Sequence, residues 1–371
     1  MTRSISRPLA LSTAWRSSPK KSGAAILDDV LRVVHEQPLD ALVLDAGWSA
    51  EALTQVRVVF ARREVALLAL RGPVGRAAPT PGDRDGAAPD AEVPDATVPD
   101  APATSVKGLR ARGGGRVWFS KPDAPADAAP STPRRPSAAR PPRLAAQDPD
   151  ERDAAIAMFG HTLEVASDLE VSLCTWSLGA TDPESLPPLT WLGPWTRAVT
   201  EDEARMLERA TKRASVLRRP CFDAARYALD RLMRRAERAG VTIAIENAPL
   251  PLALPNAEEL HRLFAEFGGG PLAYAHDMAA ARLCMDLGGA PGKEVLDAGR
   301  AHLRLLYVSD ARERHAWLPL GQGELPIEGF VGATGEVPLV LAPRADWTRA
   351  EVDHGLERLR EALRQAAVKK R

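Results

Sequence analysis

Two carboxylates stand at the ends of apolar runs in the second half of the chain. Glu246 follows the run VTIAI, and Asp277 follows LAYAH. Two carboxylates that lie side by side can hold a divalent cation through hard oxygen ligands, or can act as a general acid and a general base. Each of them can instead cap a loop or pair with an arginine. The spacing alone leaves both interpretations open.

The alternation of side chains along these runs predicts where the carboxylates point. In VTIAIEN the bulky Val and Ile residues share one face, and Glu246 lies on the other. In LAYAHD the alanines share a face with Asp277, while Leu272, Tyr274 and His276 lie opposite. Bulky residues pack beneath covering helices, and neighbouring strands lie about 4.8 Å apart. We therefore expect the two carboxylates to be neighbours, pointing inward at one end of a sheet or barrel.

Eight apolar runs alternate with helical patterns along the chain. They span residues 9–15, 41–47, 65–72, 171–176, 241–248, 272–277, 303–310 and 337–343. This alternation predicts βαβ units and a parallel sheet, and eight units match a (β/α)₈ TIM barrel, an α/β fold of about 250 residues. Capping motifs predict helix starts at Asp148, Thr200, Asn256 and Thr348. A doubly wound open sheet is the alternative, but no GxGxxG or GxxxxGK motif follows the first run.

Residues 74–147 have a different composition, rich in Pro, Ala, Gly and charged residues, with the repeat PDAEV-PDATV-PDAPA. Such a segment cannot bury enough apolar surface to offset the entropy of ordering it. We therefore predict strands one to three in residues 1–73, a long disordered insertion over 74–147, and the remaining strands and a C-terminal helix in 148–371. The insertion is either a solvated linker or, because its second half is basic, a docking arm for a partner protein.

The bulk composition argues against several classes of protein. The 49 basic and 49 acidic side chains leave a formal charge of +0, so no overall field attracts nucleic acid or an anionic membrane. No apolar run approaches the roughly 18 residues of a membrane span. The three cysteines are scattered and form no CxxC pair, which predicts a reducing, cytoplasmic environment.

Residues 241–343 resemble the sugar-phosphate isomerase/epimerase family of xylose-isomerase-like TIM barrels. The motifs that carry the resemblance are IAIENAP, LAYAHD, HLRLLYVSDARERHAWLPLGQGELPIEGF and VPLVLAP. Within them, Glu246-Asn247-x-Pro249, Asp277, Asp310 and the loop Leu320-Gly321-Gln322-Gly323 match the family pattern. The rest of the chain resembles the family more weakly.

The resemblance implies one divalent metal ion that polarises a sugar carbonyl while carboxylates move a proton. Glu246 and Asp277 match two of the four implied ligands. Tyr307 stands where the family has a histidine ligand, Ala342 where it has a glutamate, and Ala280 replaces a further histidine. Such an incomplete set would hold Mg²⁺ or Mn²⁺ weakly or not at all, unless waters or another side chain complete the shell.

Other polar and aromatic residues fall near the predicted strand ends, where a TIM barrel binds its substrate. Asp310 and His315 are candidates for contacts with a sugar, and so are Trp15, Asp45 and Trp176. Each tryptophan can equally plug the barrel, and His315 can be an ordinary loop residue. The structure decides between these roles.

Two hypotheses follow. The first is an isomerase or epimerase acting on a small polyol, sugar or sugar phosphate, with Glu246 and Asp277 catalysing proton transfer and a divalent ion assisting if one binds. The alternative is a non-catalytic barrel that has lost its metal centre and binds a ligand or a partner protein. The resembling family also includes DNA-repair endonucleases with three zinc ions, but the strand ends here lack the histidines for such a site.

Overall fold

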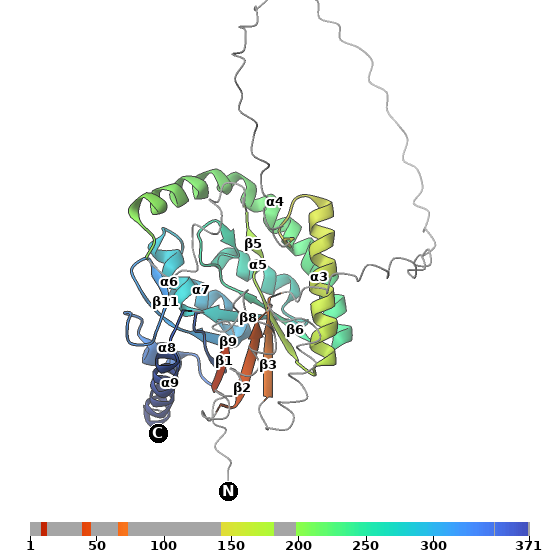
Figure 1. Ribbon diagram of the computed structural model, residues 1–371. Helices are drawn as coiled ribbons and strands as arrows, with labels where there is room; N and C mark the ends of the chain where they lie inside the picture. The colour runs from red at the N-terminus through yellow and green to blue at the C-terminus, as the bar shows by residue number, and fades with distance from the viewer. Residues whose placement is uncertain are drawn as a thin grey trace, which may run out of the picture. The chain divides into compact units, whose positions relative to one another are not determined.

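A closed barrel of eight parallel strands forms the centre of the computed structural model (Figure 1), which describes residues 9–12, 39–45, 66–72, 142–181, 198–344 and 346–369. The strands follow the order β1-β12-β9-β8-β6-β4-β3-β2 around the barrel. They are β1 (Leu9–Ser12), β2 (Ala41–Asp45), β3 (Ala66–Arg71), β4 (Leu173–Trp176), β6 (Thr242–Glu246), β8 (Leu272–Asp277), β9 (Leu303–Val308) and β12 (Leu339–Leu341). This closed order confirms the predicted TIM barrel and excludes the open doubly wound sheet.

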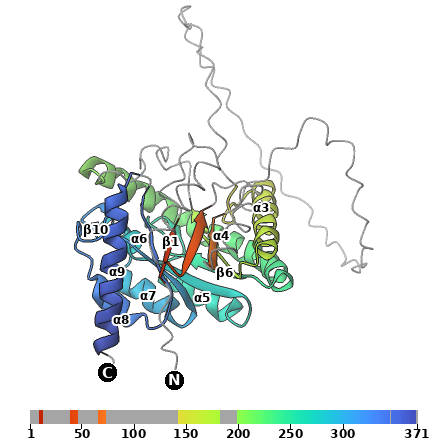
Figure 2. The same cartoon turned by 60° about the horizontal axis from the view of Figure 1, so that its bottom comes forward.

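Helices pack around the barrel, and α3 and α4 lie side by side in both views (Figures 1 and 2). The described helices are α3 (Pro149–Asp168), α4 (Glu201–Ala239), α5 (Ala257–Phe267), α6 (Met278–Asp286), α7 (Gly292–Gly299), α8 (Ile327–Ala333) and α9 (Arg349–Lys369), with a short 3₁₀ turn, η3 (Arg300–His302). Four of them begin at the predicted capping residues. Two small antiparallel pairs, β5 (Gly179–Ala180) with β7 (Ala253–Leu254) and β10 (Asp310–Arg312) with β11 (His315–Leu318), lie outside the barrel sheet.

The strands separate large from small side chains across the barrel wall. Alternate residues such as Ile243, Ile245 and Tyr274 join the outer core beneath the helices. The inward residues form a separate cluster dominated by alanine, with Ala244 and Ala275 among its members. The predicted alternation along β6 and β8 is therefore confirmed, and small inward residues leave room for larger side chains in the barrel.

The C-terminal boundary predicted for the insertion is wrong by several residues. Leu144, Ala145 and Ala146 are fully buried, and Arg143 forms an ion pair with Glu151 of α3 at 2.8 Å. Residues 142–147 therefore pack on the barrel rather than belonging to the insertion, because Leu144 joins the outer core. The rest of the predicted insertion, residues 74–141, lies outside the described residues.

Among the described helices, none combines the length and the apolar composition required to cross a membrane.

The corrected boundary predicts that two deletions will behave differently. Replacing residues 78–140 with a short Gly/Ser linker should change the melting temperature by only a few degrees, because that composition cannot form a core. Gly72 and Pro142 border one cavity, so a short linker can join the flanking segments. Extending the deletion through residue 144 removes a buried leucine and should lower the free energy of unfolding by roughly 2 to 4 kcal/mol. Urea unfolding of both variants measures this, and equal stabilities would contradict the corrected boundary.

His276 is a buried titratable residue of the outer core. Its Nδ1 lies 2.7 Å from the hydroxyl of Tyr274, and its ring stacks near Phe330. Among the residues that the structure describes, its Nε2 has no hydrogen-bond partner. Burial, with a smaller contribution from the charge of Arg300, lowers the pKa of His276 to about 3. The folded protein therefore keeps this ring neutral at pH values where the unfolded chain protonates it.

This difference predicts a loss of stability in mild acid. Below the unfolded pKa of about 6.5, the unfolded chain binds one more proton at this position than the folded protein does. The free energy of unfolding should then fall by about 1.4 kcal/mol per pH unit from this group alone as the pH drops toward 3. Urea unfolding of the parent and of His276→Gln between pH 7 and pH 5 isolates the contribution. Parallel pH profiles for the two proteins would show that His276 does not carry it.

Candidate functional site

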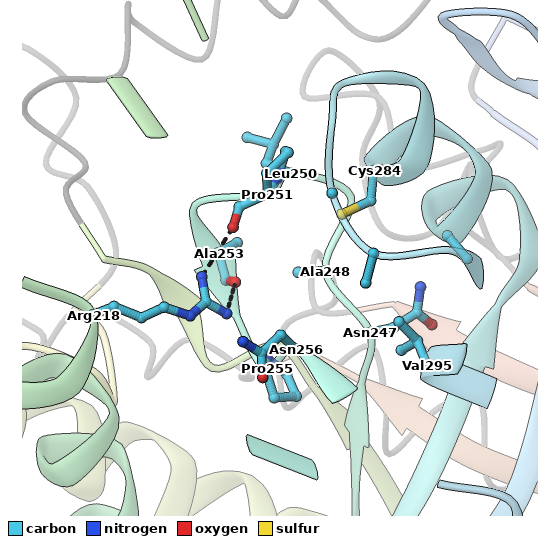
Figure 3. Close-up of a pocket in the computed structure, with 13 residues that line it drawn as sticks. Arg218, Asn247, Ala248, Leu250, Pro251, Ala253, Pro255, Asn256, Cys284 and Val295 are labelled. Atoms are coloured by element: carbon cyan, nitrogen blue, oxygen red, sulfur yellow. Dashed lines mark hydrogen bonds between the residues drawn. The ribbon is translucent and has the colours of Figure 1, made fainter. Parts of the chain in front are cut away.

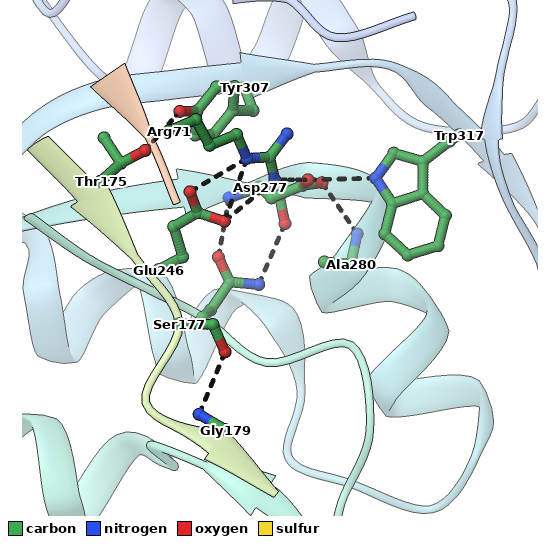
Figure 4. Close-up of polar contacts among 10 residues, drawn as sticks. Arg71, Thr175, Ser177, Gly179, Glu246, Asp277, Ala280, Tyr307 and Trp317 are labelled. Atoms are coloured by element: carbon green, nitrogen blue, oxygen red, sulfur yellow. Dashed lines mark hydrogen bonds and ion pairs between the residues drawn. The ribbon is translucent and has the colours of Figure 1, made fainter. Parts of the chain in front are cut away.

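Three charged side chains meet at the C-terminal mouth of the barrel, on β3, β6 and β8 (Figure 4). Arg71 Nε donates to Glu246 Oε1 at 3.0 Å, and Arg71 Nη2 donates to Glu246 Oε2 at 2.9 Å. Arg71 Nη2 also lies 3.4 Å from Asp277 Oδ2. The two carboxylates are thus neighbours, as predicted, and one guanidinium binds both of them.

The ring of Tyr307 supports the guanidinium of Arg71. The guanidinium carbon lies 4.2 Å from the centroid of the Tyr307 ring, which is a cation–π arrangement. The hydroxyls of Tyr307 and Thr175 are 2.7 Å apart, and both residues are fully buried. A bidentate carboxylate and an aromatic face together fix the plane of the guanidinium.

Asp277 is held by donors on all sides. Oδ1 accepts from the backbone N–H of Ala280 at 2.9 Å, which caps α6, and Oδ2 accepts from Nε1 of Trp317 at 3.0 Å. The Asn247 side chain exchanges two hydrogen bonds with the Asp277 backbone, which ties the ends of β6 and β8 together. Burial raises the pKa of Asp277 above the usual value for aspartate, and the charge of Arg71 opposes that rise.

The donor set does not fit a divalent metal ion. Glu246 and Asp277 already bind Arg71, the Tyr307 hydroxyl is engaged by Thr175, and Ala342 offers no ligand atom. Within the described part of the chain, no group of three or more His, Cys, Asp or Glu side chains could hold a metal. The arginine pairing that the sequence left open as an alternative is the arrangement in the structure.

A cavity of about 260 Å³ opens beside this cluster. Its polar wall includes Arg71, Thr175, Ser177 and Glu246, and Phe159 contributes to its apolar wall. A second cavity, behind Asn247, measures only about 40 Å³ and is bordered by Arg218, which donates to two backbone carbonyls (Figure 3). That space suits a water molecule or two. Of these two cavities at the barrel mouth, the larger can accept a small polar ligand.

Comparison with known proteins decides the family. A family model described as a xylose isomerase-like TIM barrel matches residues 133–362, more than half of the chain. The chain belongs to this family. A search of curated protein sequences gives no match.

Several solved structures share the fold at low sequence identity. A D-tagatose 3-epimerase-like protein superposes with a TM-score of 0.60 at 13% identity, covering 98% of this chain and 100% of the other. An L-ribulose 3-epimerase gives 0.57 at 11% identity, covering 98% and 96%. D-psicose 3-epimerase from Clostridium cellulolyticum gives 0.55 at 10% identity, covering 97% and 99%. At these identities the likeness shows the common barrel.

Asp310, which matches the family pattern, serves the loop that follows it rather than the cavity. Its carboxylate accepts hydrogen bonds from the backbone N–H groups of Ala311, Gly321 and Leu325, at 2.9, 2.9 and 3.0 Å. A Cβ atom at Gly323 would collide with Asp310 Oδ1, so the Gly-x-Gly sequence lets the loop wrap this carboxylate. These contacts give Asp310 a structural role in the loop, and Asp310 does not border the 260 Å³ cavity.

The other predicted contacts divide into two groups. Trp176 is fully buried and packs edge-on against Phe159, with ring centroids 4.5 Å apart, so it plugs the outer core and cannot wall a sugar site. His315 lies on β11 with its Nε2 3.3 Å from Arg344 Nη1, and it does not border the 260 Å³ cavity. Trp15 and the side chain of Asp45 lie outside the described residues.

Two residues of the site, Arg71 and Trp317, were not predicted from the sequence. Arg71 ends the run VALLALR on the inward face, so the rule that selected Glu246 and Asp277 could have found it. Trp317 reaches Asp277 from β11, where its backbone adopts a φ of 55°. Because a left-handed conformation at tryptophan depends on tertiary packing, strand alternation gave no signal for this contact.

The role of Asp310 predicts a large effect on stability. Asp310→Ala leaves three backbone N–H groups without their acceptor and should lower the free energy of unfolding by about 3 kcal/mol. Asp223→Ala on α4 is the matched control, because this exposed aspartate forms a surface ion pair with Arg226 and should cost less than about 1 kcal/mol. Chemical denaturation measures both variants. Similar values for the two would contradict the clamping role of Asp310.

Proposed function

We propose that this barrel isomerises a small sugar or polyol-derived carbonyl compound bound in the 260 Å³ cavity. The observation that carries the proposal is the position of Glu246, a buried carboxylate that borders the cavity next to a fixed cation. The hydroxyls of Thr175 and Ser177 border the same space and can bind sugar hydroxyls. Family membership and the epimerases among the structural neighbours support a sugar as the ligand.

Glu246 acts as the base in this proposal. It removes the proton from the hydroxyl-bearing carbon next to the carbonyl, and the electron pair of that C–H bond moves toward the carbonyl oxygen, giving an enediolate. The proton then returns to the former carbonyl carbon. The O–H proton of the neighbouring hydroxyl moves to the former carbonyl oxygen, so that the hydroxyl-bearing carbon becomes the new carbonyl and the isomerisation is complete. Although Arg71 binds both Glu246 oxygens, a carboxylate has about four lone-pair sites, so capacity remains for the substrate proton.

The geometry favours isomerisation over epimerisation. Transfer between adjacent carbons can proceed with one base on one face of the substrate, whereas inversion by two bases needs a second group on the opposite face. Asp277 is 1% exposed and does not border the cavity, and its oxygens already accept from Ala280, Trp317 and Arg71. We therefore assign Asp277 as a positioning residue that holds Arg71.

A second candidate function is ligand binding without catalysis. The pairing of both carboxylates with Arg71 favours it, because the oxygens that would take the substrate proton already accept hydrogen bonds from the guanidinium. In that case the cavity would bind a sugar and leave it unchanged. An experiment that separates binding from proton transfer distinguishes the two functions.

Proton exchange with solvent provides that experiment. A panel of aldoses, ketoses and their phosphates is incubated with the protein in D₂O, and NMR follows deuterium incorporation next to the carbonyl. We expect exchange with at least one sugar, and a decrease of about 10² or more in Glu246→Gln, typical of the loss of a general base. Glu258→Gln, a surface change on α5, should retain the parent rate.

Calorimetry on the same panel separates the outcomes. Sugar binding that persists in Glu246→Gln without exchange in any protein supports the ligand-binding alternative. Exchange that is equal in the parent and in Glu246→Gln would rule out Glu246 as the base.

A further inference from the structure

The centre of the barrel mouth already contains a cation that belongs to the chain. The Arg71 guanidinium lies between the carboxylates of Glu246 and Asp277, with N–O distances of 2.9 and 3.4 Å from Nη2. These are the two carboxylates that the resemblance assigns to a metal ion. We propose that Arg71 permanently takes the place of the divalent cation, so that the site excludes Mg²⁺ and Mn²⁺ and supplies its positive charge from the protein.

The guanidinium of Arg71 is fixed in a largely buried position and does not form an ordinary surface ion pair. The side chain of Glu246 is 10% exposed, that of Asp277 is 1% exposed and that of Arg71 is 23% exposed. Two N–H groups on one edge of the guanidinium match the two oxygens of Glu246, and the Tyr307 ring supports its face. A divalent ion bound to these oxygens would lie beside the guanidinium and be repelled by its charge, so it would have to displace this fork.

The substitutions around the site are consistent with this exchange of cations. Tyr307 stands where the resemblance expects an imidazole ligand, and its ring now lies against Arg71. Ala342 stands where it expects a third carboxylate. Three carboxylates with a divalent ion carry one net negative charge, and Glu246, Asp277 and Arg71 carry the same net charge. Loss of one carboxylate therefore accompanies replacement of a divalent cation by a monovalent one.

A fixed guanidinium can also perform the electrostatic part of the reaction. Arg71 borders the cavity next to Glu246, so it can donate hydrogen bonds to the substrate oxygen on which negative charge develops. Donors that are preorganised toward a developing oxyanion lower the barrier without solvent reorganisation. This step rests on the proposed function, whereas exclusion of metal by Arg71 does not.

Metal titration tests the proposal directly. Mn²⁺ binding is measured by calorimetry and by electron paramagnetic resonance on the chelator-treated chain of 371 residues. The parent should show no saturable site at these carboxylates up to millimolar Mn²⁺. Arg71→Met, which keeps the side-chain length and removes the charge, should bind Mn²⁺ at least about tenfold more tightly, since it releases two carboxylates.

A second set of variants tests whether Arg71 blocks the old ligand positions. Tyr307→His with Ala342→Glu should gain less than about threefold in Mn²⁺ affinity while Arg71 remains, because the guanidinium still binds Glu246 and Asp277. Adding Arg71→Met to this pair should raise the affinity by about a hundredfold over the parent, since four protein ligands then surround one ion. Arg226→Met, which removes one exposed positive charge from α4, is the matched control and should leave Mn²⁺ affinity unchanged.

The outcomes are distinguishable. Saturable Mn²⁺ binding to the parent that Glu246→Gln abolishes overturns the proposal, and this measurement does not depend on the folding of any Arg71 variant. Metal gain by the Tyr307→His and Ala342→Glu pair with Arg71 in place overturns it as well. Arg71→Lys should remain unable to bind Mn²⁺ because it keeps a monovalent cation. If metal is excluded but no sugar exchanges deuterium, the proposed function fails while the role of Arg71 stands.

Discussion

The ion pair between Arg71 and Glu246 is the interaction on which the barrel mouth depends. Removing two carboxylates and a guanidinium from water is costly, and the cost is offset only when geometry and additional hydrogen bonds are good. Here the fork of Arg71 meets both oxygens of Glu246, and Asp277 receives donors from Ala280 and Trp317. Removing one of these three side chains leaves another charge buried without a partner, which is strongly destabilising. Each of the three charges therefore depends on the other two.

The barrel provides the space that this cluster needs. Its inward residues are mostly alanines, which fill the interior only partly and leave room for Tyr307 and Arg71 at the mouth. The bulky residues on the other face of the same strands pack under the helices and fix the strand register. Because each strand contributes one inward residue to the rim, the charges of β3, β6 and β8 converge without being close in sequence. Arg71 and Glu246 are 175 residues apart.

Most of the fold was predictable because it follows local periodicity. Alternation along VTIAIEN and LAYAHD was sufficient to place Glu246 and Asp277 inward, and the alternating strands and helices were sufficient to predict the barrel. Contacts that depend on tertiary packing were not predictable in this way. Trp317 reaches Asp277 from an antiparallel pair outside the barrel sheet. Leu144 lies in a stretch of sequence whose composition resembles that of the insertion, yet its side chain packs in the outer core.

The contacts of two residues differ from the roles that the family motif predicts for their positions. Asp310 matches the family pattern, but its oxygens are used by the backbone of the loop that contains Gly321 and Gly323. Tyr307 departs from the pattern, and it supports the guanidinium that binds both remaining carboxylates. A missing ligand therefore does not by itself indicate a lost site, because charge compensation can be rebuilt from a different strand. In this barrel Arg71 on β3 places a positive charge beside the carboxylates of β6 and β8, and Glu246 borders the cavity next to it.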